Sequence, residues 1–342
     1  MNRNMMALLA SFVTLTAATV DVASAGAILD GIRQRGQIRC GVMNPLPAWN
    51  YADAKGEWQG FNADVCRALA VAVFNDPSKA QITTTTPAVR LTALQTGELD
   101  VLVANVTETL TRDTELGLTF APVIFYDGQG IMVRKDLNVN SAKELDGATV
   151  CVSPGTTTEL NLADYFRSNG LKFQTVVIEN QAETRRAFTE GRCDALTDDR
   201  TTLASQRLAL NDPENYIVLP EALSKEPLAP VTRQGDDQWA DIVRWTIYSL
   251  IEAEELDIRK DNVEAVAEKS ADPRVQRFLG VTPGLGKALG LDEKWAANVI
   301  KNVGNYGELY DQHLGEKSPM KLPRAANDLW SKGGQLYSRA FR

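Results

Sequence analysis

Apolar positions follow two different spacings along the first half of the chain, and each spacing predicts a different element. Helical spacing is found at residues 28–35, 62–74 and 90–96. Short apolar or β-branched runs occupy residues 37–42, 81–86 and 100–104. Because these strands and helices alternate, the first part of the chain is predicted to form a mostly parallel sheet covered by helices.

The same alternation begins again near the middle of the chain. Strands are predicted at residues 149–152, 175–178 and 195–197, and helices at residues 158–168 and 181–190. Beyond Pro230 the pattern becomes helical, and residues 239–255 carry a continuous apolar face. The sequence therefore predicts an α/β protein with two units of roughly 100 residues each, followed by a long helical tail.

Composition and charge narrow the class of protein. The chain has 342 residues, of which 44% are hydrophobic and 23% charged, as in soluble globular proteins. Its formal net charge is −8. Nucleic acids and anionic membrane surfaces attract clustered Lys and Arg, so we expect neither as a partner.

The N-terminus has the pattern of a secretory signal peptide. Arg3 precedes an uncharged stretch at residues 5–20, and Ala23, Ser24 and Ala25 form a small-residue end. A membrane anchor is the alternative, but the stretch contains Ser and Thr and is shorter than a span of about 20 residues. We expect cleavage after residue 25 and a soluble, periplasmic mature protein.

All four cysteines, Cys40, Cys66, Cys151 and Cys193, fall within the mature chain. An even number in an exported protein suggests disulfides, and four cysteines allow three pairings. Sequence separation favours Cys40 with Cys66 and Cys151 with Cys193. A zinc site is the alternative, but the chain has no C-x-x-C pair, and the single histidine, His313, is distant and expected on the surface.

Motifs of common enzymes are missing from the sequence. Neither H-E-x-x-H nor G-x-S-x-G occurs. The glycines around Gly286 match neither a phosphate loop nor a dinucleotide-binding loop. We therefore predict no catalytic residue, no cofactor and no bound metal.

Four polar or aromatic clusters follow predicted strands, where open α/β sheets bind ligands. They are residues 46–51 with Trp49, residues 105–107 with Arg112, the run Gly155, Thr156, Thr157 and Thr158, and the pair Asp198 and Asp199. Each has a purely structural alternative: an aromatic covering the core edge, a surface base, a turn with a helix cap, or a capping Asp. Together they suit a zwitterion, whose carboxylate binds Arg and helix N-termini and whose ammonium binds a carboxylate.

Several motifs in the same order resemble those of the polar amino-acid-binding proteins of bacterial ABC importers. They are residues 56–61, 105–112, 155–158 and 191–199. Residues 66–68, 151–157 and 226–231, together with the helical tail, are similar to the general L-amino-acid-binding branch. The resemblance covers nearly all of the mature chain.

This resemblance implies a two-lobed periplasmic-binding-protein fold with two hinge crossings. Lobe 1 would comprise residues 26–125 and 226–342, including the C-terminal helical extension, and lobe 2 residues 126–225. The lobes would close over one L-amino acid and deliver it to the membrane permease subunits of the importer. The protein would act as a monomer.

The resemblance also assigns a role to each matched residue. Arg112 would hold the ligand carboxylate with the backbone N–H groups of Thr107 and Thr157, beside Gly155 and Thr156. Asp199 would hold the ammonium, with oxygens of Asn105 and Thr107 nearby, and Trp49 would cover the ligand side chain.

Two acidic residues depart from the pattern. Glu108 and Asp198 stand beside matched positions, where they either face solvent or favour basic ligands. The rival function is an enzyme on the same scaffold, such as a cyclohexadienyl-type dehydratase, with Glu108 as its general acid. Arg90 is predicted to be a base on a helix surface, unconnected with the ligand.

Overall fold

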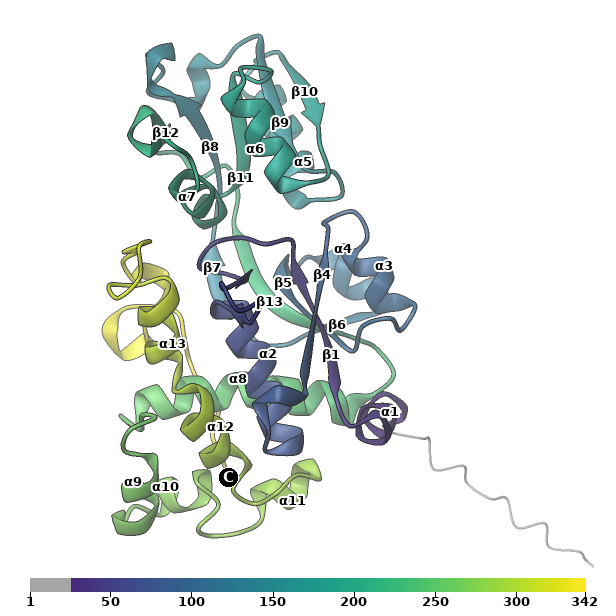
Figure 1. The fold of residues 1–342 in the computed structure, drawn as a ribbon, viewed down its shortest axis with the longest axis vertical. Coiled ribbons are helices and arrows are strands. Elements are labelled where there is room, and N and C mark those ends of the chain that lie inside the picture. Colours follow the sequence, from purple (N-terminus) through teal and green to yellow (C-terminus); the bar gives the residue numbers. More distant parts are fainter. Residues whose placement is uncertain (1–25) are drawn as a thin grey trace, which may run out of the picture.

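The computed structural model describes residues 26–342 and divides them into two lobes stacked along the long axis of the molecule (Figure 1). The predicted signal peptide, residues 1–25, lies outside the described residues. Each lobe contains one central sheet flanked by helices, and the chain crosses between the lobes twice (Figure 1). This is the two-lobed α/β architecture that the sequence predicts.

The sheet of lobe 1 has the strand order β4-β1-β5-β13-β6, with β7 paired to β13. Its strands are β1 (Ile38–Met43), β4 (Ala80–Thr85), β5 (Val101–Thr107), β6 (Leu118–Phe120), β7 (Phe125–Asp127) and β13 (Glu226–Arg233). β1 runs parallel to β4 and β5, whereas β13 runs antiparallel to β5 and β6. The sheet is therefore mixed, because β13 returns directly from lobe 2 without a crossover helix.

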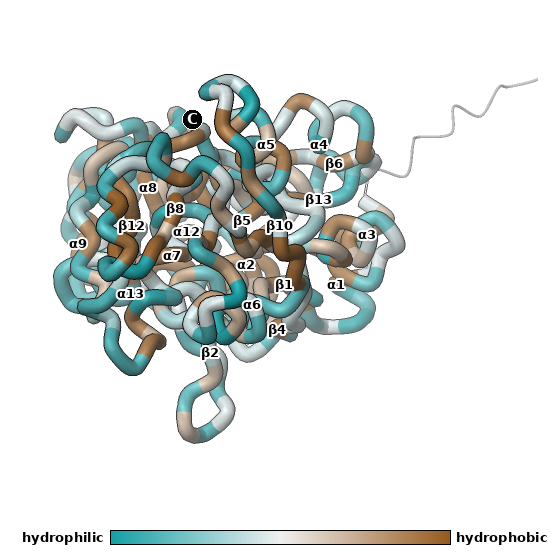
Figure 2. Tube along the Cα trace, turned by 90° about the horizontal axis from the view of Figure 1, so that it is seen from above, coloured by the Kyte–Doolittle hydropathy of each residue, from teal (hydrophilic) through white to brown (hydrophobic). Residues whose placement is uncertain are grey.

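The lobe 1 helices are α1 (Ala27–Arg35), α2 (Phe61–Phe74), α3 (Arg90–Gln95), α4 (Leu110–Thr114) and α8 (Asp237–Glu255), with a 3-10 turn, η1 (Pro77–Lys79). A small hairpin of β2 (Tyr51–Ala52) and β3 (Trp58–Gln59) projects from the rest of the chain (Figure 2). Gly60 starts α2 with φ 116°, and a Cβ there would lie 2.5 Å from the backbone of Trp49. Only glycine fits this approach without strain.

Lobe 2 has the strand order β10-β9-β11-β8-β12. Its strands are β8 (Gln129–Arg134), β9 (Ala148–Val152), β10 (Phe173–Val177), β11 (Ala195–Asp199) and β12 (Tyr216–Val218). Its helices are α5 (Thr157–Ser168), α6 (Gln181–Thr189) and α7 (Arg200–Leu208), with 3-10 turns at η2 (Lys135–Leu137), η3 (Ala142–Glu144) and η4 (Pro213–Asn215). β9 is parallel to β10 and β11, so their carboxyl ends face the same edge of the sheet.

The C-terminal extension shares its hydrophobic core with lobe 1 and the hinge strand β7 (Figure 1). It contains α9 (Val263–Lys269), α10 (Pro273–Phe278), α11 (Leu285–Leu289), α12 (Trp295–Val303) and α13 (Tyr306–His313), then η5 (Ala325–Asn327) and η6 (Trp330–Lys332). α2, α8 and α12 share one hydrophobic core with β1 and β5 of lobe 1. No helix within residues 26–342 combines the length and the apolar character that a membrane span needs.

Polar contacts fasten the extension to the rest of lobe 1. His313 is only 6% exposed, and its Nε2 lies 2.7 Å from Asp64 Oδ2 on α2, so the prediction of a surface histidine is wrong. Asn327 pairs with both the backbone N–H and the carbonyl of Tyr126 in β7. The Tyr306 hydroxyl donates to the Ile124 carbonyl at 2.7 Å. The extension therefore holds one of the two hinge strands.

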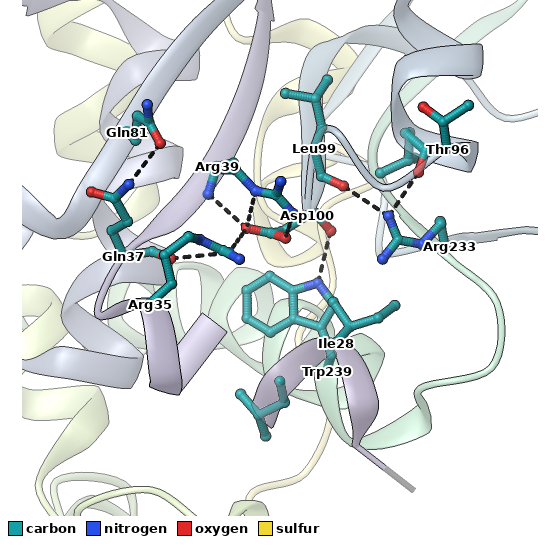
Figure 3. A network of polar contacts seen from close by, with 12 residues as sticks. Ile28, Arg35, Gln37, Arg39, Gln81, Thr96, Leu99, Asp100, Arg233 and Trp239 are labelled. Carbon is teal, nitrogen blue, oxygen red and sulfur yellow. Dashed lines mark hydrogen bonds and ion pairs between the residues drawn. The ribbon is translucent and has the colours of Figure 1, made fainter. Parts of the chain in front are cut away.

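A buried aspartate fixes the start of β5. Asp100 is 2% exposed and pairs with Arg39 of β1 at 2.8 Å and with Arg35 of α1 (Figure 3). Its carbonyl accepts the indole N–H of Trp239 on α8 at 2.9 Å. The elements β1, α1 and α8 therefore all contact the residue at the start of β5, and the other end of β5 carries Asn105 and Thr107.

Both disulfides favoured by sequence separation are present. Cys40 of β1 is joined to Cys66 of α2, and Cys151 of β9 to Cys193 just before β11. Each bridge lies within one lobe. Neither restrains movement of the lobes against each other.

Candidate functional site: a cavity between the lobes

One cavity lies where the strand ends of the two lobes meet. Of the residues predicted from sequence, Asn105 and Thr107 reach it from lobe 1, and Thr156, Thr157 and Asp199 reach it from lobe 2. Its wall also includes Met43, Leu46, Pro87, Arg90, Ser153, Thr158, Gln181, Asp198 and Thr202. The site is therefore assembled from both lobes, and only when they are in contact.

The lobes are closed over this cavity. The Ser205 hydroxyl of α7 donates to the Pro47 carbonyl of lobe 1 at 2.6 Å, and the Thr86 hydroxyl of lobe 1 donates to Glu179 of lobe 2 at 2.5 Å. The space open to the centres of water molecules is about 20 Å³, enough for one or two waters. An amino acid can therefore enter only after the lobes separate.

Arg112 is not one of the residues that line the cavity; it lies beside the lining residue Thr107 and contacts both lobes. α4 begins after Thr109, whose hydroxyl accepts the Arg112 backbone N–H at 3.2 Å. The guanidinium donates to the Thr107 carbonyl at 2.9 Å and to the Gly155 carbonyl of lobe 2 at 3.5 Å. Burial lowers the pKa of Arg112, while Glu226 and Asp199 raise it. An arginine remains cationic under such shifts.

The N-terminus of α5 supplies a second set of donors. Gly155 has φ 71°, which turns the chain into the helix, and the Thr156 side chain caps the helix by accepting the Glu159 N–H at 3.1 Å. The backbone N–H groups of Thr157 and Thr158 belong to the first turn, which has no carbonyl partners within a helix. Such N–H groups, with the helix dipole, favour an anion at this position.

Asp199 supplies the opposite charge. It ends β11 and directly precedes α7, but its side chain makes no capping hydrogen bond, so its carboxylate is free to face the cavity. Burial raises the pKa of Asp199 well above its usual range, and the neighbouring Asp127, Asp198 and Glu226 raise it further. A cationic group in the cavity would relieve this repulsion.

Asp198 also lines the cavity and is half-buried. Its Oδ1 accepts the Asp199 N–H at 2.9 Å, and its Oδ2 accepts the Gln206 side-chain amide at 3.2 Å. Burial raises the pKa of Asp198 to about 7 and that of Asp127, on the hinge strand β7, to about 6.

The prediction that Arg90 lies on a helix surface is wrong. Arg90 is 4% exposed and lies in the cavity wall. Its Nη1 donates to the carbonyls of Ala104 and Asn105 and contacts Met43 Sδ at 3.3 Å. Burial lowers its pKa to about 9, against the attraction of Asp199 and Asp198. The available signal was its position at the start of the helix that follows β4, next to the strand ends that form the site.

Trp49 and Glu108 lie elsewhere than their predicted roles require. Trp49 is 1% exposed, and its ring packs edge-on against Phe61 and Phe125 at 5.8 and 5.2 Å. It belongs to the lobe 1 core rather than the cavity wall. Glu108 lines a separate surface hollow that also includes Tyr126 and Arg244. Neither side chain touches the cavity between the lobes.

Sequence reasoning also missed Glu226. It is the first residue of β13, is 1% exposed, and accepts hydrogen bonds from residues of both lobes. Residues 226–231 belong to one of the motifs that carry the resemblance, but the motif does not show what Glu226 contacts, because its partners are distant in sequence.

Comparison with known proteins gives a consistent set of relatives. The family model for bacterial extracellular solute-binding proteins, family 3, matches residues 38–262. The general L-amino acid-binding periplasmic protein AapJ of Rhizobium johnstonii is 51% identical over 94% of both chains. The glutamate/glutamine/aspartate/asparagine-binding protein BztA of Rhodobacter capsulatus is 47% identical over 95% of this chain and 96% of that protein.

A solved structure agrees with these relatives. The ABC transporter periplasmic binding protein from Brucella ovis, with glutathione bound, superimposes with a TM-score of 0.90. It is 46% identical, and the alignment covers 93% of this chain and all of that one.

Proposed function

Since the chain belongs to the family 3 bacterial extracellular solute-binding proteins, we propose that it is a periplasmic receptor that captures L-amino acids between its lobes and delivers them to the permease of an ABC importer. The observation that carries this proposal is that one cavity brings together groups suited to both charges of an amino acid. The α5 N-terminus and the Asp199 carboxyl group line the cavity, and the Arg112 guanidinium lies beside the lining.

The proposed pose follows from these charges. The ligand carboxylate binds Arg112 and the backbone N–H groups of Thr107 and Thr157, with Gly155 and Thr156 shaping the start of α5. The ammonium binds Asp199, with the side-chain oxygens of Asn105 and Thr107 nearby. Arg112 comes from lobe 1 and Asp199 from lobe 2, so the ligand favours the closed state, in which it contacts both.

We propose a broad specificity. The main-chain charges of the ligand are common to all amino acids, and the wall adds both a cation, Arg90, and an acid, Asp198. We expect several L-amino acids to bind within about tenfold of one another, which is about 1.4 kcal/mol. The names of two relatives support this breadth. One is a general L-amino acid-binding protein, and the other binds glutamate, glutamine, aspartate and asparagine.

We also propose that the protein binds without turnover and acts as a monomer. The dehydratase alternative relied on Glu108 as general acid, and that side chain lines a different hollow. A general acid must come within hydrogen-bond reach of the group that it protonates. The position of Glu108 therefore favours binding over catalysis.

The test is mass spectrometry of ligand released from protein purified without added substrate, followed by calorimetric titration with a panel of L-amino acids. We expect one unmodified amino acid per chain. Steady conversion of a bound compound that Glu108→Gln abolishes, or a thousandfold preference for one ligand, would contradict the proposal.

A further inference from the structure

The Glu226 side chain connects both lobes and the hinge. Its Oε2 accepts the hydroxyls of Thr107 at 2.6 Å and Thr157 at 2.8 Å. Its Oε1 accepts the side-chain amide of Asn161 at 2.9 Å and the hydroxyl of Ser224. Four donors therefore meet one carboxylate that is 1% exposed.

These donors come from three parts of the molecule. Thr107 ends β5 of lobe 1, Thr157 and Asn161 belong to α5 of lobe 2, and Ser224 lies at the hinge crossing. Glu226 itself is fixed to the hinge, because it pairs with Asp127 of β7. The carboxylate can keep all four bonds only while the lobes are closed.

The same bonds set the direction of two hydroxyls at the proposed ligand site. The Thr107 and Thr157 hydroxyls both donate to the same oxygen, Glu226 Oε2, so each directs its hydrogen at the carboxyl group. The remaining lone pairs of Thr107 Oγ1 are then free to accept. This is the polarity that an ammonium group requires, and it is set before the ligand arrives.

We propose that Glu226 is a positioning residue that acts as a latch: it stabilises the closed state from the hinge side and orients the Thr107 hydroxyl as an acceptor. The inference of the latch stands on the contacts of Glu226, and its effect on affinity rests on the proposed function. A latch of this kind gives the empty protein a closed population. The ligand then selects that population rather than creating it.

The decisive variant is Glu226→Gln, which keeps the size of the side chain. An amide has one acceptor oxygen and one donor nitrogen, so two of the four donors lose their acceptor and meet an N–H₂ group instead. The matched control is Glu221→Gln. Glu221 also accepts a hydroxyl, that of Ser141 at 2.5 Å, but both residues lie in lobe 2.

Small-angle scattering of the empty and ligand-saturated proteins measures the latch directly. We expect empty Glu226→Gln to be more expanded than empty wild type, and the saturated proteins to be equally compact. Calorimetry with the amino acid identified above should show about tenfold weaker binding, or about 1.4 kcal/mol. Glu221→Gln should match wild type in both measurements.

Equal compaction of empty wild type and empty Glu226→Gln would overturn the latch. So would a Glu226→Gln protein that expands equally with and without ligand, since that result indicates general loosening. If Glu226→Gln does not fold, Asn161→Ala removes one lobe 2 donor and should give a smaller expansion in the same direction; no expansion there overturns the proposal. The scattering of empty protein needs no ligand, so a failure of the proposed function is recognised separately, by the absence of amino-acid binding.

Discussion

Replacing Asp199 with asparagine should weaken ligand binding and, at the same time, stabilise the empty protein. In the closed empty cavity Asp127, Asp198 and Glu226 all oppose ionisation of Asp199. Its pKa is raised, so the neutral form is favoured, and asparagine resembles that neutral form in shape. At pH 7.5 the folded protein must either protonate Asp199 or keep it ionised against burial and its acidic neighbours, and asparagine removes this cost without leaving a cavity.

The two effects differ in size as well as in sign. The empty protein should gain about 1 kcal/mol, in the range of substitutions that relieve an unfavourable functional site, which corresponds to a rise in Tm of about 2–4 °C. A buried ion pair that loses one partner costs about 3–5 kcal/mol. Since about 1.4 kcal/mol is tenfold, affinity for an amino acid should fall by at least a hundredfold.

Calorimetric titration and scanning calorimetry of the same samples check both effects. Asp164→Asn is the control, because the Asp164 side chain is 75% exposed and its ion pair with Arg167 is on the surface of α5. It should leave affinity and Tm unchanged. An Asp199→Asn protein with wild-type affinity would remove Asp199 from the ammonium site, and a lowered Tm would refute the electrostatic argument.

Four further predictions concern other charges, the disulfides and pH. Arg112→Met should lose affinity about a hundredfold in calorimetry while Arg167→Met, at a 79% exposed side chain, does not; equal affinities would refute the carboxylate assignment. Arg90→Met removes the cation near Asp198 and Asp199 and should therefore lower Tm. Because the cavity wall then lacks this cation, the binding of acidic ligands should weaken more than that of neutral ligands in competition titrations. An unchanged Tm and an unchanged order of ligand affinities would contradict this. Replacing Cys151 and Cys193 together by serine should lower the free energy of unfolding by about 3–4 kcal/mol, measured in urea, without changing compaction on ligand binding; loss of that compaction would mean that the bridge is needed for closure. The raised pKa values of Asp198, about 7, and Asp127, about 6, make the empty protein less stable as pH rises from about 4 to 7. Because binding of the ligand ammonium releases protons in this range, affinity should increase with pH by up to about tenfold per unit for each proton released. An affinity that stays constant between pH 5 and 8 would count against this prediction.

The elements that the sequence predicts well are those with a strong local pattern. α2 and α5 follow their apolar spacing within a residue or two, and β5 begins one residue after its predicted start. β13 was not predicted, because residues 226–233 contain Pro227 and Pro230, which are unusual in a central strand. The sheet accommodates Pro230 by a register shift between Ala229 and Val231, which is a tertiary adjustment with no local signal.

The residues at the site also differ in how well the sequence predicts their position. Clusters after strands drew attention to Asn105, Thr107, Thr157 and Asp199, and these residues line one cavity because parallel strands bring their carboxyl ends together. The direction of a single side chain is decided by packing around it, which is why Trp49 lies in the core. Likewise Arg90 lies in the cavity wall, and His313 is buried in a hydrogen bond with Asp64. Glu226 has four hydrogen-bond partners that come from three parts of the molecule, and a local sequence pattern does not predict such contacts.

The place of β13 in the sheet has a consequence for how the chain folds. The strands and helices of lobe 2 lie between β8 and β12 as one continuous segment, whereas β13 enters lobe 1 between β5 and β6 after that whole segment has been made. Contacts that are close in sequence form faster, because shorter loops must be closed. Refolding should therefore proceed in two phases, with lobe 2 first and the sheet of lobe 1 completed only when β13 inserts. Until β13 inserts, β5 and β6 each have one unpaired strand edge, and aggregation of the exported chain competes with folding at this stage.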